Sequence, residues 1–169
     1  MNGHPGGEEH SLRMLDLAKL PAGALILDMG AGGGETVELL RRKGYAVRGL
    51  DLAPRSGLVE QGDFLHTSFP EKSFDAVISQ CAFYVSGDAG GALREARRIL
   101  KPGGKLLLSD VFFAYPVPLL HAAGFTVLHA EDMTAVWREY YLEALWREDG
   151  LCEFPHGTCR YWLLIGERS

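Results

Sequence analysis

The sequence has few of the features that mark specialised classes of protein. It contains only three cysteines, an odd number, which argues against a disulfide-stabilised fold and favours reduced thiols in the cytoplasm. No apolar run approaches the ~20 residues of a membrane span, and we expect no signal peptide, because no charged region precedes an apolar stretch at the start. Lys and Arg number 17 against 22 Asp and Glu, which gives a net charge of −5. This balance argues against a nucleic-acid-binding surface and against attraction to anionic membranes.

The length and the alternation of apolar patterns predict one α/β domain. A chain of 169 residues with 47% hydrophobic residues suits a single domain, which we expect to span residues 1–169. Strands are expected at residues 24–28, 45–51, 58–64, 74–81, 105–110, 126–130 and 161–165. Helices are expected at residues 10–20, 35–43, 89–100 and 135–147. Residues 1–10 are expected to form either a flexible tail or a lid, with Ser11 as the N-cap of the first helix.

A glycine-rich turn follows the first expected strand. It runs from Asp28 through Gly30, Gly32 and Gly34 to Glu35, where a helical pattern begins. Glycines let the backbone turn sharply and approach a ligand, and the helix N-terminus presents unpaired N–H groups there. A dinucleotide-binding turn requires a third glycine where this chain has Glu35, whose charge would repel a pyrophosphate. The acidic turn therefore favours a cationic ligand, and a turn that binds nothing is the alternative.

Two segments resemble motifs of a known enzyme family. The spacing Asp28-x-Gly30-x-Gly32-x-Gly34 resembles motif I of the class I S-adenosylmethionine (SAM)-dependent methyltransferases, and SAM is a cation. The run from Ala96 to Asp110 resembles the R-V/I-L-K-P-G-G-x-L segment of the menaquinone and ubiquinone C-methyltransferases, of methyltransferase type 11. The resemblance covers about residues 10–110. It implies a Rossmann-like doubly wound sheet of seven strands, mostly parallel, with the last strand antiparallel and inserted between the fifth and sixth.

The resemblance also implies which residues bind the cofactor. The glycine turn would line the methionine part of SAM, and Asp51 at the end of the second strand would bind the ribose hydroxyls. Asp63 would receive the adenine amino group, Phe64 would pack on the ring, and Gln80 would lie by the methyl group. The expected cofactor-binding residues are Asp28, Gly30, Ala31, Gly32, Asp51, Leu52, Asp63, Phe64 and Gln80. Taken singly, Asp51 could instead cap a strand or helix, and Asp63 could belong to a simple turn.

Cys81 is the candidate residue for the chemistry because it ends the expected fourth strand, and ligands of open α/β sheets bind beyond the carboxyl ends of the strands. It could bind a soft acceptor such as arsenic, or it could be a small buried filler, as cysteine often is. Cys152, His156 and Cys159 do not have a standard zinc spacing, so no metal site is expected. Together with Cys81 the two thiols could form a trigonal soft-metal site, and arsenite methyltransferases use several cysteines.

These features predict an enzyme that transfers a methyl group from SAM to a small-molecule acceptor, at carbon, oxygen or sulfur, and releases S-adenosylhomocysteine (SAH). The segment Gln80-Cys81-Ala82-Phe83 stands where enzymes that methylate amide or exocyclic nitrogens carry N/D-P-P-Y/F/W, which disfavours DNA-base and protein-amide acceptors. Glu35 disfavours a nucleotide-dependent oxidoreductase. His4 and His10 are the better site candidates among the histidines, because they lie in the expected tail or lid.

A SAM-binding partner or regulatory subunit without turnover of its own is the main alternative. Quinone-type relatives carry a substrate-binding segment after the fifth strand, and this chain has only a short stretch at residues 111–121. A second subunit could complete such an open site, through aromatic residues expected to be exposed at Phe112, Phe113 and Tyr115. The same surface could form a homodimer. An arsenite-type methyltransferase is the third hypothesis.

Overall fold

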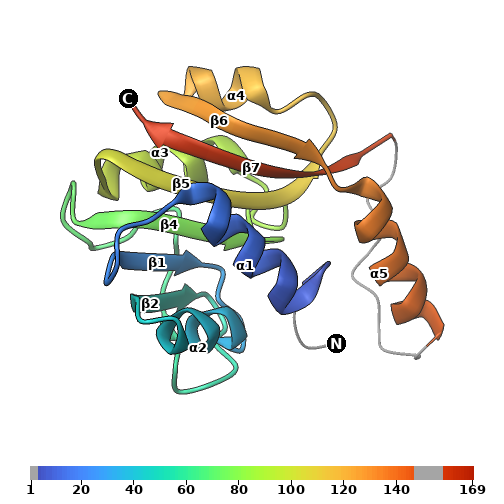
Figure 1. The fold of residues 1–169 in the computed structure, drawn as a ribbon, viewed down its shortest axis with the longest axis horizontal. Coiled ribbons are helices and arrows are strands. Elements are labelled where there is room, and N and C mark those ends of the chain that lie inside the picture. Colours follow the sequence, from blue (N-terminus) through green and yellow to red (C-terminus); the bar gives the residue numbers. More distant parts are fainter. Residues whose placement is uncertain (1–3, 147–157) are drawn as a thin grey trace.

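The computed structural model describes residues 4–146 and 158–169, which form a sheet with helices on both faces (Figure 1). Its strands are β1 (Leu25–Met29), β2 (Ala46–Asp51), β3 (Glu60–Gln61), β4 (Phe74–Gln80), β5 (Leu100–Phe112), β6 (Phe125–Asp132) and β7 (Arg160–Arg168). Their order in this described sheet is β3-β2-β1-β4-β5-β7-β6. The strands from β3 to β5 pair in parallel, whereas β7 runs antiparallel to both β5 and β6. The doubly wound architecture and the inserted last strand expected from the sequence are confirmed.

Helices cover both faces of this sheet, because parallel neighbours need crossover connections. They are α1 (Gly7–Ala18), α2 (Glu35–Arg42), α3 (Ala89–Ile99), α4 (Val117–Ala122) and α5 (Thr134–Trp146). On one face, Met14 of α1 and Val37 of α2 pack in a cluster with Ile78 of β4. On the other face, Leu93 of α3 and Leu120 of α4 belong to a second cluster. None of the helices in the described ranges is long and apolar enough to cross a lipid bilayer.

The strand β1 is apolar except for Asp28, because both of its faces are covered. Ile26 belongs to the cluster under α1 and α2, and Leu27 belongs to the cluster under α3 and α4. Asp28 lies opposite Gly49 of β2 and Ile78 of β4. The one acidic residue of β1 is therefore held between two neighbouring strands, close to where all three end.

Two element boundaries near the site differ from the sequence-based expectation. Helix α1 begins at Gly7 rather than at residue 10, after Gly6 in the left-handed conformation, so Ser11 is not its N-cap. Ser11 instead lies inside the helix and is buried. Strand β3 has only two residues in place of the expected 58–64, because it is an edge strand that pairs at two positions with β2.

The segments before and after β5 also differ from expectation. Strand β5 begins at Leu100 instead of residue 105, and its register to β4 shifts, so Pro102 and Gly103 bulge within the strand rather than forming a separate turn. Phe112 was expected to be exposed but is buried, whereas the next residue, Phe113, is 52% exposed. Successive side chains of a strand point to opposite faces, and this alternation accounts for the difference. Helix α4, which the sequence did not predict, follows at Val117–Ala122.

Candidate functional site

The glycine turn between β1 and α2 lies against the end of β2. The N–H groups of Gly30 and Ala31 donate to the carbonyl oxygen of Leu50, at 2.8 and 3.1 Å. Gly30 has a φ of 83°, and a Cβ on it would overlap the Cβ of Ala82, in the loop after β4. Only glycine meets both conditions, the positive φ and the close approach. The turn thus brings the carboxyl ends of β1, β2 and β4 together. We call this side of the sheet, where the parallel strands end, its carboxyl edge.

Asp51 is bonded directly to this turn, as its place at the end of β2 allows. Its Oδ2 accepts a hydrogen bond from the Gly32 N–H at 2.9 Å, and its Oδ1 accepts one from the Ala53 N–H at 2.9 Å. Arg55 was not found by sequence reasoning, and it donates its backbone N–H to the Gly32 carbonyl at 3.0 Å. Its guanidinium lies over Gly32, because a Cβ there would be 2.8 Å from Nη2. No spacing in the sequence marks this long-range contact.

Acidic groups gather under the turn. Asp28 is 3% exposed, and burial, followed by the nearby charges of Asp51 and Glu35, raises the pKa of its carboxyl to about 7. Burial makes the ionised form of the Asp28 carboxyl unfavourable, and repulsion by Asp51 and Glu35 adds to this. A bound cation would relieve the repulsion, and a bound anion would add to it. The electrostatics of this edge favour a positively charged ligand.

Asp63 and Phe64 follow Gly62, whose N–H donates to the Asp51 carbonyl oxygen at 2.9 Å, but their side chains are held differently. Asp63 Oδ1 accepts from the Leu65 N–H at 2.8 Å, so this carboxylate closes a turn of its own. Phe64 is buried and stacks on Phe83 with ring centroids 5.8 Å apart. Leu52, just after β2, is 64% exposed. Three of the expected cofactor residues therefore surround the end of β2, with the aromatic ring turned into the core.

Gln80, the last residue of β4, is the centre of a polar network. Its Oε1 accepts from the hydroxyls of Ser11, at 3.3 Å, and Thr36, at 3.1 Å. Its Nε2 lies 3.1 Å from Nδ1 of His4. The network joins α1, α2 and β4 at the edge where the glycine turn ends. Sequence reasoning singled out Gln80 and His4, but it took Ser11 for a helix cap and gave no role to Thr36.

Cys81 belongs to a second network. It has a φ of 60°, in the left-handed region that residues with side chains rarely adopt, and such positions cluster at functional sites. Its Sγ lies 3.3 Å from the Tyr161 hydroxyl, which donates to the Ser109 hydroxyl at 3.0 Å. Burial raises the pKa of Tyr161 well above its usual value, so this phenol stays protonated. Cys81 is only partly buried.

Asp110, at the end of β5, fixes the loop that carries Cys81. It is 1% exposed, and its Oδ2 accepts from the N–H groups of Phe83 and Tyr84, at 2.8 and 3.1 Å. Burial raises the pKa of this carboxyl to about 6, although the backbone N–H bonds act to lower it. The sequence gave no signal for this role, because the bonded loop lies 26 or 27 residues away.

Cys159 is buried in the cluster of side chains around Tyr161, against which Cys81 also packs. Cys152 and His156 lie outside the described residues. Within the two described ranges, no group of three or more His, Cys, Asp or Glu residues could hold a metal ion. Whether three thiols meet stays a prediction of the sequence.

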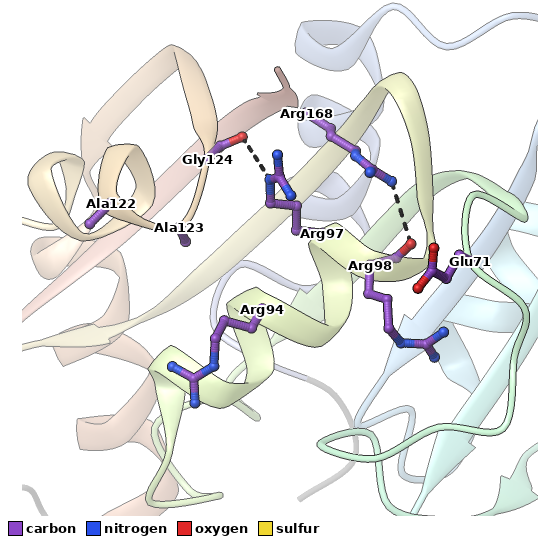
Figure 2. A pocket seen from close by; sticks show the side chains of 8 residues that line it. All are labelled: Glu71, Arg94, Arg97, Arg98, Ala122, Ala123, Gly124 and Arg168. Atoms are coloured by element: carbon purple, nitrogen blue, oxygen red, sulfur yellow. Dashed lines mark hydrogen bonds between the residues drawn. The ribbon is translucent and has the colours of Figure 1, made fainter.

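A separate pocket of about 480 Å³ opens at the other edge of the sheet, where the parallel strands begin (Figure 2). Arg168 donates to the carbonyl oxygens of Leu100 and Arg98, and Arg97 Nε donates to the Gly124 carbonyl at 3.4 Å. Arg168 thus bonds to carbonyl groups at the end of α3, and Arg97 bonds to the carbonyl of Gly124 after α4. The Arg98 and Gly124 carbonyls also accept from the backbone N–H groups of Lys72 and Ser169. The arginines here hold the fold together, away from the glycine turn.

Comparisons with known proteins agree with this geometry. The methyltransferase domain family matches residues 27–108. A demethylmenaquinone methyltransferase of Thermus thermophilus is 30% identical over 165 residues, covering 88% of this chain and 69% of that protein. Another, from Tropheryma whipplei, is 34% identical over 110 residues, covering 56% of this chain and 44% of that protein. The chain thus spans less than half the length of several curated relatives that it matches.

Among solved structures, geranyl diphosphate C-methyltransferase from Streptomyces coelicolor, in complex with SAH, has the same fold, with a TM-score of 0.78 at 15% identity. That match covers 95% of this chain and 79% of the other. The chain belongs to the family of class I SAM-dependent methyltransferases. The cofactor of this family is SAM, which becomes SAH when its methyl group is transferred.

Proposed function

We propose that this protein transfers a methyl group from SAM to a small-molecule acceptor, at a carbon, oxygen or sulfur atom. The observation that carries the proposal is the bond between the Asp51 carboxylate and the Gly32 N–H of the glycine turn. It sets an acidic group beside the buried Asp28, at the edge of the sheet where ligands of α/β folds bind. A sulfonium with an ammonium tail suits this excess of negative charge.

The proposed contacts follow the order of the strand ends. Asp28, Gly30, Ala31 and Gly32 would line the methionine part, and Asp51 with Leu52 would bind the ribose. Asp63 would bind the adenine amino group, with Phe64 packed beside the ring. Gln80 and Cys81 would lie beside the methyl group. The support is positional, since these residues lie at the ends of β1, β2 and β4 and just after β2 and β3.

The chain's contribution to the chemistry would be position rather than acid–base catalysis. When bound, SAM supplies an electrophilic methyl group on a positively charged sulfur. The Gln80 network and the loop held by Asp110 would fix the direction from which the acceptor approaches the methyl group. Orienting the nucleophile in this way accounts for much of the rate enhancement in such a reaction. A carbon or sulfur nucleophile needs little help from a base.

The test is calorimetric titration of the protein with SAH, with NADH as the control ligand. We expect micromolar binding of SAH, no binding of NADH, and at least tenfold weaker SAH binding by Asp51→Asn. Asp16→Asn, on the exposed side of α1, removes the same charge away from the site and should bind as the wild type does. The absence of SAH binding by the wild type would rule out the proposal.

One observation favours the second candidate function, a SAM-binding partner subunit. Tyr84 and Phe113 lie together with ring centroids 5.8 Å apart, and they are 39% and 52% exposed. Tyr115 nearby in the chain is 58% exposed. A protein surface, or a second copy of the chain, could cover these rings. SAH binding together with dimer formation in ultracentrifugation, and no turnover in an acceptor screen, would favour this function.

Two finer assignments remain proposals. A metalloid acceptor is supported by Cys81 and Cys159 lying in one cluster around Tyr161, and arsenite belongs in the acceptor screen for that reason. A cytoplasmic location is supported by the small, odd number of cysteines. Cell fractionation would test it.

A further inference from the structure

His10 is a buried polar side chain that the fold alone does not explain. It lies in α1 and is only 4% exposed. Neither of its ring nitrogens has a hydrogen-bond partner among the residues that the structure describes. Buried side-chain nitrogen and oxygen atoms are nearly always hydrogen-bonded in native proteins. Burying an imidazole without a hydrogen bond costs free energy, which an apolar side chain at this position would avoid. We therefore expect His10 to have a polar partner when the protein acts.

The neighbours of His10 place it beside the reacting end of the proposed site. Its ring centroid is 6.0 Å from that of His4, which contacts Gln80, and 6.3 Å from that of Tyr161, which contacts Cys81. Gln80 and Cys81 are consecutive residues at the carboxyl end of β4. His10 therefore lies next to both networks, on the side of α1 that meets β7.

The charge state of His10 defines what it can bind. The titratable groups that face it are His4, Arg13, Glu131 and Tyr161, and Arg13 pairs with Glu131 at 2.6 Å. Burial, followed by the charges of His4 and Arg13, lowers the pKa of His10 to about 4. The ring is neutral at pH 7, with one N–H donor and one acceptor nitrogen. A hydroxyl group, which also donates and accepts, matches a neutral imidazole.

Resting on the proposed methyl transfer, we propose that a ring nitrogen of His10 hydrogen-bonds the methyl acceptor and selects neutral acceptors that carry a hydroxyl group. Trp137 and Tyr161, stacked with centroids 6.5 Å apart, form a rigid apolar wall beside His10, so a polar group of the acceptor would find few other partners there. His10 is thus a specificity-determining contact, separate from the residues proposed to hold the cofactor.

The experiment titrates the SAH-loaded protein with phenol while the imidazole signals of His10 are followed by NMR. Toluene, with a methyl group in place of the hydroxyl, is the matched probe. We expect a saturable shift of the His10 signals with phenol and at least fivefold weaker binding of toluene. His10→Phe should lose at least fivefold in phenol affinity and keep its SAH affinity within twofold. His121→Phe, on an exposed position of α4, should match the wild type in both.

Each outcome separates this inference from the proposed function. His10 signals that do not move with phenol, or equal phenol binding by His10→Phe and the wild type, overturn the role of His10. Wild-type protein that binds no SAH overturns the proposed function instead. The titration of the wild type needs no variant, so it decides the role of His10 even if His10→Phe does not fold.

Discussion

At the amino ends of the parallel strands, arginine side chains bond to backbone carbonyl groups, whereas the carboxyl ends hold a buried carboxyl group with a raised pKa and a buried imidazole without a hydrogen-bond partner among the described residues. Arg168 and Arg97 bond to backbone oxygens at the first edge (Figure 2). At the other edge Asp28 has a strongly raised pKa, and His10 has no hydrogen-bond partner within the described residues. The comparison teaches that arginines around a pocket can find their partners within the fold, and that buried polar groups without partners are the better sign of a ligand site.

The largest expected effect is on the free energy of unfolding, and it comes from removing the buried carboxyl group of Asp28. The folded pKa of Asp28, about 7, lies above its usual 3.8, so its contribution to stability is complete at low pH and is lost as the pH rises from about 4 to 7. Asp28→Asn should therefore raise the free energy of unfolding at pH 8 by up to about 4 kcal/mol and change it little at pH 4. Urea denaturation at four pH values would measure this.

Asp16→Asn is the control for that series, and it should keep the pH dependence of the wild type. If Asp28→Asn shows the same decline in stability between pH 4 and 8 as the wild type, the pKa of Asp28 is not raised in the folded protein. The contrast between the two edges would then disappear.

A second prediction concerns the close approach in the glycine turn. Gly30→Ala should lower the free energy of unfolding by about 3 kcal/mol and abolish SAH binding, because the new Cβ would overlap Ala82 at a positive φ. Gly57→Ala is the control, since no atom lies within 4 Å of a Cβ placed there. Chemical denaturation and calorimetry would measure the two effects. Unchanged stability of Gly30→Ala would mean that the turn can move.

The smallest expected effect concerns the arginine edge. Arg168→Gln should lower the free energy of unfolding by about 1 kcal/mol, because carbonyl groups near the end of α3 lose a donor, and it should leave SAH affinity unchanged. Arg94→Gln is the control, since Arg94 is exposed and 3.8 Å from Asp88, and should change stability by less than about 0.5 kcal/mol. A clear loss of SAH affinity in Arg168→Gln would contradict the assignment of this edge to structure alone.

The sequence predicted the turn and the strand ends at which the proposed cofactor residues lie. The spacing from Asp28 to Gly34 and the acidic end of β2 are local patterns, and in the structure Gly32 bonds to Asp51; that they bind the cofactor stays a prediction. The roles of Ser11 and Thr36 could not be predicted, because Gln80 lies 69 and 44 residues away along the chain. Only the folded chain brings such residues together, and neither has a spacing that reveals its partner.

The fold was predicted well where apolar runs are buried on both faces and poorly at the edges. The central strand β1 was recognised from its continuous apolar run. Strand β3 was expected to be longer than its two residues, since at an edge few neighbours define how far pairing extends. The start of α1 was placed too late, because glycines near Gly6 weaken the helical pattern in the sequence while the folded chain still forms a turn there.

The position of β7 has a consequence for how the chain is made. β7 lies between β5 and β6 but follows both of them in the sequence. During synthesis, β6 therefore leaves the ribosome before the strand that will join it to the sheet exists. Until β7 has been translated, β5 and β6 each present an unpaired edge, which is a hazard for aggregation. The sheet therefore stays divided in the nascent chain until β7 has been synthesised, and only then can β6 join the other strands.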